Sequence, residues 1–465
     1  MSSSPDVRTL IIGGGITGLS AAYELVKGGS KPTIIEAQPV LGGVIQTETV
    51  EGCVLEGGPD SFLAAKPAAN ELIREVGLGD QLIGSKDHER VTYLVKGGRL
   101  IPLPDGLMMM VPTRILPVAF SPLLSWGTKM RMGLEYFRKP PAVPMADRSV
   151  EEFITDHYGR ETVDYLAEPL LAGVYGGSAA RLSVNSVLTR FVELESKYGS
   201  LTRGVLEAKR RAPKGGAAAP LFQTLKGGLT QLTGELQRRI QGQSEVITGR
   251  AERVERRESG YSVRVNGEDI QADAVIMACP AWQAGALLGS VDERLAGLLE
   301  GVEYSSSITM ALGYRREQCG RIPPGFGFLV PLKERRSLVA CTFVGAKFPY
   351  RVPDSHVMLR CFLGGAGDEA ILDWSDDDLV AVVRSELKRL LGWDAAPAFT
   401  RIRRWRRSMA QYPVGHAARV RQIREILTGL PGLEVAGNAY EGIGIPDCVR
   451  TGRAAARAVI AADPA

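Results

Sequence analysis

The stretch that decides the fold is 7–18, which reads Val-Arg-Thr-Leu-Ile-Ile-Gly-Gly-Gly-Ile-Thr-Gly. Its first half is a short apolar run with β-branched residues, bounded by glycine, a pattern typical of a buried parallel strand. Apolar residues at helical spacing follow as far as Gly28, and a second apolar run, 32–35, ends at Glu36. The sequence therefore predicts a strand–turn–helix–strand unit, the opening of a Rossmann-type α/β fold.

The glycine spacing inside this unit predicts dinucleotide binding. The first glycine of Gly13-x-Gly15-x-x-Gly18 allows a tight turn, the second lets the backbone approach a pyrophosphate, and the third lets the helix pack on the strand. The helix begins at Ile16 and Thr17, where free N–H groups favour an anion. A carboxylate at Glu36 accepts hydrogen bonds from ribose hydroxyls and disfavours a 2′-phosphate, so NAD or FAD is preferred over NADP.

Two further glycine clusters favour the longer of these cofactors. Gly42 and Gly43 follow Glu36 closely, where the chain can pass beside a second part of an extended molecule. Near the other end, the run from Gly437 to Gly444 leads into a helix that starts near Ile445 and can face a flavin ring. We therefore predict FAD.

Composition limits the other possibilities. The chain has 465 residues, of which 45% are hydrophobic and 23% charged, which fits a globular protein of two or three domains. A net charge of +4 gives no reason to expect nucleic acid as a partner. The six cysteines contain no C-x-x-C pair, so we expect no metal site and interpret them as thiols of a reducing compartment.

The remaining pattern predicts a second, mixed sheet and a helical part. Residues 253–256 and 261–265 alternate as a hairpin, 337–343 and 357–363 are predicted strands of a separate sheet, and 376–391 is a predicted helix. We expect a Rossmann-type FAD-binding domain, a mixed-sheet substrate domain and a helical domain. Their predicted ranges are 1–60, 220–291 and 404–465 for FAD binding, 61–99 and 292–403 for the substrate, 100–205 for the helices, and 206–219 for a loop.

The helical part leaves two interpretations open. In 129–138, Met130, Leu134 and Phe137 share one helical face beside several basic residues. The helix either packs against the core or forms a basic amphipathic surface that rests on a membrane. Because neither a signal peptide nor a convincing membrane span is visible, we expect a cytoplasmic protein, with peripheral membrane contact and a homodimer both left open.

Several motifs in order resemble FAD-dependent flavoproteins of the amine oxidase and phytoene desaturase type, and most closely the protoporphyrinogen and coproporphyrinogen III oxidases. The resemblance covers nearly the whole chain. It rests on Glu56-Gly-Gly-Pro-Asp-Ser-Phe62, Glu168-Pro-Leu-Leu-Ala-Gly-Val-Tyr-Gly-Gly177, Thr224-Leu-Lys-Gly-Gly-Leu229, Gly325-Phe-Gly-Phe-Leu-Val-Pro331, Arg404-Trp405 with Gln411-Tyr-x-x-Gly-His416, and Gly437-Asn-Ala-Tyr-x-Gly-Ile-Gly444. The chain departs from the family pattern at Gly176, Ser178 and Ala410, and the departures at Gly176 and Ser178 bear on the substrate-facing helix.

The resemblance implies a six-electron oxidation of a porphyrinogen in three flavin cycles, each reoxidised by O₂ to give H₂O₂. The substrate would lie in an apolar slot, with cations at its mouth for the propionates. We expect propionate contacts from Arg99 and Lys66, and slot walls from Val174, Leu329, Leu338, Phe362 and Ile443. The expected cofactor contacts are Gly13, Gly15, Ile16, Thr17, Gly18, Glu36, Gly42, Gly43, Gly58, Pro59, Asp60, Val254, Trp405, Gly437, Gly444 and Ile445.

No nucleophile or dedicated base can be named from the sequence, and His416 is expected to have a structural role. The substrate is either coproporphyrinogen III, slightly favoured by the extra cation Lys66, or protoporphyrinogen IX. Other functions stay open: an amine oxidase, a carotenoid desaturase, or a non-catalytic relative that binds a lipid carrier.

Overall fold

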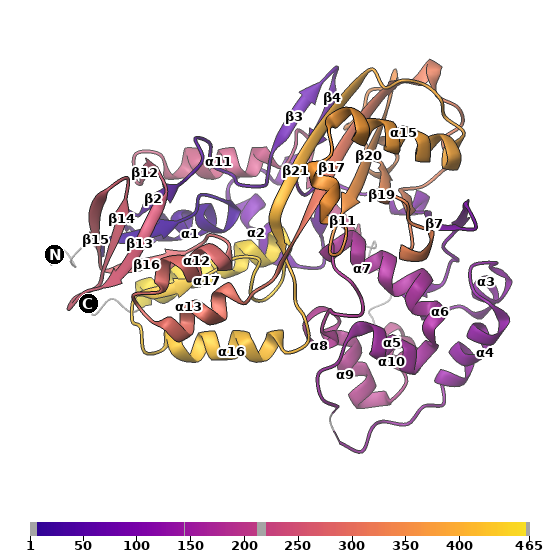
Figure 1. The fold of residues 1–465 in the computed structure, drawn as a ribbon, viewed down its shortest axis with the longest axis horizontal. Coiled ribbons are helices and arrows are strands. Elements are labelled where there is room, and N and C mark those ends of the chain that lie inside the picture. The colour runs from indigo at the N-terminus through magenta and orange to yellow at the C-terminus, as the bar shows by residue number, and fades with distance from the viewer. Residues whose placement is uncertain (1–6, 144, 212–219, 462–465) are drawn as a thin grey trace.

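The structure is a computed structural model that describes residues 7–143, 145–211 and 220–461. Its first layer is a five-stranded parallel sheet in the order β12-β2-β1-β16-β22 (Figure 1). The glycine-bounded apolar runs form its centre, as predicted. The strands are β1 (Thr9–Ile12), β2 (Thr33–Glu36), β12 (Glu245–Thr248), β16 (Ala274–Met277) and β22 (Leu433–Val435).

Helices and a small antiparallel sheet cover the two faces of this sheet. One core lies between the sheet and four helices: α1 (Ile16–Lys27), α2 (Pro67–Glu75), α11 (Thr230–Ile240) and α17 (Ile445–Ala461). The other face packs on β13 (Ala251–Arg256), β14 (Tyr261–Val265), β15 (Glu268–Ala272), α12 (Ala281–Leu288), α13 (Glu293–Glu300) and α16 (His416–Leu427). Strands β13 and β14 are the predicted hairpin.

A seven-stranded mixed sheet forms the second layer, in the order β21-β17-β20-β19-β18-β7-β8. Its strands are β7 (Thr92–Lys96), β8 (Arg99–Pro102), β17 (Tyr304–Arg315), β18 (Gly327–Leu329), β19 (Leu338–Phe343), β20 (His356–Gly364) and β21 (Phe399–Ala410). Helix α15 (Asp376–Leu391) covers one face, and short elements complete the region: β3 (Thr47–Val50), β4 (Cys53–Glu56), β5 (Phe62–Leu63), β6 (Leu82–Gly84), β11 (Phe222–Leu225) and α14 (Val344–Lys347). The predicted boundary at residue 404 falls inside β21.

The helical part packs around a core of its own below the mixed sheet (Figure 1). Its elements are β9 (Leu107–Met108), β10 (Val111–Pro112), α3 (Ile115–Phe120), α4 (Trp126–Glu135), α5 (Val150–Tyr158), α6 (Arg160–Thr162), α7 (Glu168–Tyr175), α8 (Val184–Val187), α9 (Thr189–Tyr198) and α10 (Leu201–Arg211). The predicted loop 206–219 is wrong for 206–211, which continue α10, and its remainder lies outside the described residues. Among the described residues, no helix is long and apolar enough to cross a bilayer.

Candidate active site

The glycine turn between β1 and α1 is shaped to receive a phosphate group. Gly13 has a φ of +111°, and a side chain on Gly18 would overlap the carbonyl oxygen of Gly13. A Cβ on Gly15 would meet no atom within 4 Å, so this side of the turn is open. Helix α1 starts without a side-chain cap, which leaves the N–H groups at its start, near Ile16 and Thr17, available to an anion.

Glu36 lies at the carboxyl end of β2, beside this turn. Its Oε2 accepts a hydrogen bond from the N–H of Gly14 at 2.6 Å, and its Oε1 accepts one from Gln38 at 2.8 Å. Gly42 donates its N–H to the carbonyl of Gly14 at 2.9 Å. The structure therefore brings the predicted ribose acid and the second glycine pair to the first turn, and the fit to an extended dinucleotide is good.

The closing glycine turn lies against the opening one. The N–H of Gly437 donates to Oγ1 of Thr451 at 3.2 Å, and a Cβ on Gly437 would lie 3.7 Å from Oγ1 of Thr17. Helices α1 and α17, which follow these two turns, pack side by side (Figure 1). Gly444 and Ile445 stand at the start of α17, whose N-terminal dipole suits a flavin carbonyl.

His416 and Tyr412 hold the closing turn. Their rings stack with centroids 4.0 Å apart, and Nε2 of His416 lies 3.1 Å from the carbonyl oxygen of Tyr440. The Tyr412 hydroxyl donates to the carbonyl of Asn438 at 2.7 Å and accepts from the N–H of Gly442 at 2.9 Å. Because burial lowers the pKa of His416, its ring is neutral near pH 7, which suits the expected structural role.

The 57–61 turn is fastened to three strands of the mixed sheet. The carbonyl of Gly57 accepts hydrogen bonds from Oγ1 of Thr309 at 2.5 Å and from Nε1 of Trp405 at 2.9 Å. The carbonyl of Gly58 accepts one from the guanidinium of Arg360. The carbonyl oxygens of Gly57 and Gly58 therefore already accept hydrogen bonds from the mixed sheet. Trp405 uses its indole N–H, the only donor of that ring, to position the turn.

Asp60 is the counter-ion of a buried lysine. Its carboxylate lies 3.1 Å from Nζ of Lys347 and accepts a hydrogen bond from Oγ of Ser61 at 2.6 Å. Although burial opposes ionisation, Lys347 and Arg360 hold the pKa of Asp60 well below its usual range. The carboxylate is charged near pH 7 and already paired with Lys347, so it would act on a bound cofactor through its charge.

Two of the predicted slot walls share one face of the mixed sheet. In the strand register, Leu329 of β18 pairs with Ala340 of β19, which pairs with Phe362 of β20, so these side chains form one row. Thr309 is the next residue in this row. A Cβ on Gly173 of α7 would lie 3.5 Å from Leu329, so α7 passes over this end of the row.

The other predicted wall residues are not members of this row. Leu338 is fully buried in the core under α15, on the opposite face of the sheet, so the structure does not bring it to the row. Val174 is 56% exposed on α7, and Ile443 is half-buried just before α17. Val254 is fully buried in the hairpin core, which leaves only its backbone for a cofactor.

The two predicted propionate cations are not neighbours. Lys66 precedes α2, and its Nζ lies 2.6 Å from Oδ2 of Asp447, at the start of α17. Arg99 is exposed in the β7–β8 hairpin at the far edge of the mixed sheet. Helix α2 and strand β7 lie apart in Figure 1, so Lys66 and Arg99 come from different parts of the molecule.

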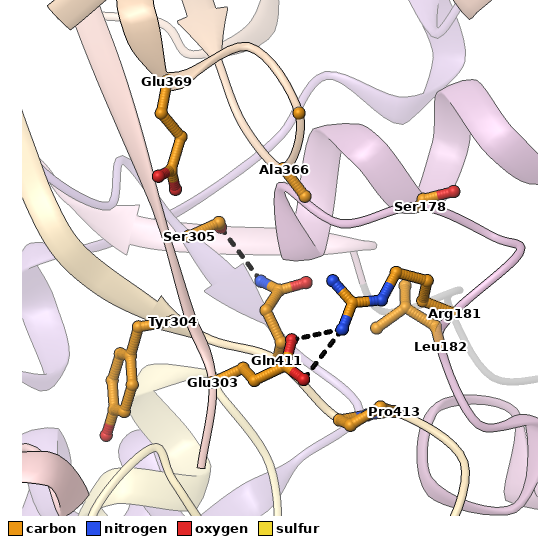
Figure 2. A pocket seen from close by; sticks show the side chains of 11 residues that line it. Ser178, Arg181, Leu182, Glu303, Tyr304, Ser305, Ala366, Glu369, Gln411 and Pro413 are labelled. Atoms are coloured by element: carbon orange, nitrogen blue, oxygen red, sulfur yellow. Dashed lines mark hydrogen bonds and ion pairs between the residues drawn. The ribbon is translucent and has the colours of Figure 1, made fainter. Parts of the chain in front are cut away.

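A cavity of about 220 Å³ is lined by residues of the helical part, of the start of β17 and of the segments that follow β20 and β21 (Figure 2). The lining residues fall within 178–182, 303–305, 366–369 and 411–413. Gln411 stands in it, and its Nε2 donates to Oγ of Ser305 at 3.0 Å and to the carbonyl of Tyr175 at 2.7 Å. An ion pair of 2.6 Å between Arg181 and Glu303 borders it. Ser178, one of the departures from the family pattern, is part of the lining.

The sequence interpretation missed Thr309, Arg360 and Lys347. Arg360 had a usable signal: it is the one charged residue among the apolar residues 357–363. A charged side chain inside a buried strand needs a counter-ion or hydrogen-bond acceptors. Lys347 and Thr309 carried no comparable signal, since their partners lie far away in the sequence.

Comparison with known proteins gives likenesses over nearly the whole chain. A family model described as flavin containing amine oxidoreductase matches residues 16–460. The chain is 34% identical to coproporphyrinogen III oxidase of Bacillus subtilis (strain 168), with 96% of this chain and 97% of the relative covered. It is 28% identical to the chloroplastic protoporphyrinogen oxidase 1 of Arabidopsis thaliana, with 95% and 85% covered.

Solved structures agree with these likenesses. A candidate protoporphyrinogen oxidase from Exiguobacterium sp. 255-15 superposes with a TM-score of 0.87 at 30% identity, and 99% of each chain is covered. A UDP-galactopyranose mutase superposes with a TM-score of 0.72 at 17% identity, with 98% of this chain and 96% of the other covered, and shows the fold alone.

Proposed function

Because the chain belongs to the family of flavin-containing amine oxidoreductases, we propose that it is an FAD-dependent oxidase that converts a porphyrinogen to a porphyrin in haem biosynthesis. The family membership confirms the resemblance inferred from the motifs. The observation that carries the proposal is the meeting of two glycine turns, 13–18 and 437–444, in a chain whose full-length relatives are porphyrinogen oxidases.

When bound, FAD would supply the redox chemistry: three hydrides from meso carbons, one in each flavin cycle, account for the six electrons, and O₂ is the acceptor that reoxidises the flavin. The chain supplies position and a dry surface. The row of Leu329, Ala340 and Phe362 offers an apolar wall to a flat macrocycle, and the opening and closing turns, which lie against each other, would hold the cofactor. Since His416 is buried and neutral, we expect pyrrole protons to leave to water.

A porphyrin-fluorescence assay tests this function. The purified protein should be yellow and contain FAD, and aerobic incubation with coproporphyrinogen III should give coproporphyrin III and H₂O₂. A colourless protein, or one that oxidises an amine or a polyene and no porphyrinogen, would contradict the proposal.

We propose coproporphyrinogen III over protoporphyrinogen IX, because several relatives at 30–34% identity carry the former name. The kcat/KM for the two substrates, measured side by side, decides between them.

Lys66→Gln and Arg99→Gln each test one propionate contact. A raised KM with unchanged FAD content supports the contact, and an unchanged KM removes that residue from the site.

We also propose that α3 and α4 rest on an anionic membrane surface. Trp126, Met130 and Leu134 are each about two-thirds exposed along one face of α4, and Phe120 of α3 is 80% exposed. Lys129 lies over the Trp126 ring at 4.5 Å. The protein should sediment with phosphatidylglycerol vesicles and much less with phosphatidylcholine vesicles. A concentration-dependent dimer with no vesicle binding would instead indicate a second copy on this face.

A further inference from the structure

The 57–61 turn rests on a buried group of charges that do not cancel. We name Asp60, Lys347 and Arg360 the turn cluster. Lys347 and Arg360 are 9% and 4% exposed; Asp60 pairs with Lys347 at 3.1 Å and is the carboxylate that acts most strongly on Arg360. The adjacent Arg351–Glu56 pair, 2.9 Å apart and buried, is neutral as a unit. The turn cluster therefore holds two cations against one anion.

Aromatic faces and a backbone carbonyl replace the missing second carboxylate. Nζ of Lys347 lies 4.7 Å from the centre of the Phe222 ring and 4.9 Å from that of Phe348. The guanidinium of Arg360 lies 5.0 Å from the centre of the Phe362 ring. Such contacts stabilise a buried cation without neutralising its charge.

Arg360 also keeps unused hydrogen-bonding capacity. Its Nε and Nη1 are buried without a hydrogen-bond partner among the described residues, while the same guanidinium donates to the carbonyl of Gly58. Its neighbours in the strand register, Ala311 and Thr342, are small and leave room for the guanidinium. The charge thus sits between the turn predicted to line the flavin and Phe362 in the predicted substrate wall.

We propose that Arg360 is a positioning residue that tunes the flavin: the net positive charge of the turn cluster favours the reduced, more negative cofactor over the oxidised one. This inference rests on the proposed function, because it requires a flavin ring beside Gly58. A positive charge in a low-dielectric setting acts over several ångströms with little screening. The negative charge of Asp60 favours the oxidised flavin, so the ratio of cations to anions in the turn cluster sets the relative stability of the reduced and oxidised flavin.

Variants of opposite charge provide the test, with sulfite as probe, since sulfite adds to oxidised flavins and leaves negative charge on the ring. Arg360→Met should weaken sulfite binding at least tenfold and lower the midpoint potential; a tenfold change corresponds to about 30 mV for a two-electron couple. Asp60→Asn should tighten sulfite binding and raise the potential. Arg360→Lys should restore most of the wild-type values.

The matched control is Arg315→Met, since Arg315 lies at the far end of β17 and is paired with Glu51 at 2.9 Å, and it should change neither value. If Arg360→Met does not fold, Lys347→Met replaces it, with the same expected direction. Shifts of the same sign in the Asp60 and cation variants, or none in proteins with full FAD content, would overturn the inference. A wild type without flavin or porphyrin formation would overturn the proposed function itself.

Discussion

Helices α1 and α4 carry apolar side chains at the same helical spacing, yet α1 buries them and α4 exposes them. Leu19 and Leu25 of α1 are fully buried between the parallel sheet and α17. On α4, Met130 and Leu134 are both 67% exposed, and only Met132 among its large apolar residues is buried. The same pattern therefore serves folding in one helix and offers a contact surface in the other, and only tertiary packing distinguishes them.

The largest expected effect comes from truncating the buried face. Leu19→Ala should lower the free energy of unfolding by about 2–5 kcal/mol, because it leaves a cavity under α17. Denaturant unfolding measures the change. Leu134→Ala on α4 is the matched control, and an equal loss there would contradict the distinction between the two helices.

A smaller effect is expected at the point that fixes α4 to its neighbour. Glu161 accepts hydrogen bonds from the N–H and Oγ of Ser125, at 2.9 and 2.6 Å, and from Oγ1 of Thr128 at 2.6 Å. Although burial opposes them, these bonds lower the pKa of Glu161 to about 2. Glu161→Gln should reduce the free energy of unfolding by about 1.5–3 kcal/mol at pH 7.

The same contact predicts a pH dependence. Because the pKa of Glu161 is lower in the folded chain than in the unfolded chain, its stabilisation is present above about pH 4.5 and disappears as the pH falls toward 2. The stability difference between wild type and Glu161→Gln should therefore shrink over this window in acid-unfolding experiments. If the stability difference between wild type and Glu161→Gln stays constant over this pH range, the charge of Glu161 does not stabilise the fold.

The smallest effect on stability is expected on the exposed face. Leu134→Ser should change the free energy of unfolding by less than about 0.5 kcal/mol, because the side chain already faces solvent. The same variant should reduce binding to anionic vesicles severalfold, measured by sedimentation. Unchanged vesicle binding, in Leu134→Ser and in Met130→Ser, would argue that this face does not contact lipid.

Helices and strands were predicted accurately where residues next to them in the sequence mark their ends. Helix α15 has the predicted bounds, because Ser375 caps its start, three acids follow, and Gly392 ends it in the left-handed region. The opening β1–α1–β2 unit and the strands β19 and β20 were also found, since glycine turns and apolar runs mark them.

What depended on distant contacts could not be predicted. Leu338 and Phe362 both lie in predicted strands, but the face that each presents follows from the strand register. Lys66 was expected to bind substrate, and nothing near it in the sequence indicates its ion pair with Asp447. Arg360 obtains its environment from Asp60 and Gly58, which are 300 and 302 positions away.

The order in which the strands join the parallel sheet has a consequence for the newborn protein. Strand β22 and helix α17 complete a layer that begins with β1 and α1, and they are translated long after those two elements. Until they are made, α1 lacks one of the helices that cover it, and the opening glycine turn lacks the closing turn that lies against it. A cofactor that needs both glycine turns therefore binds only after β22 and α17 have been made.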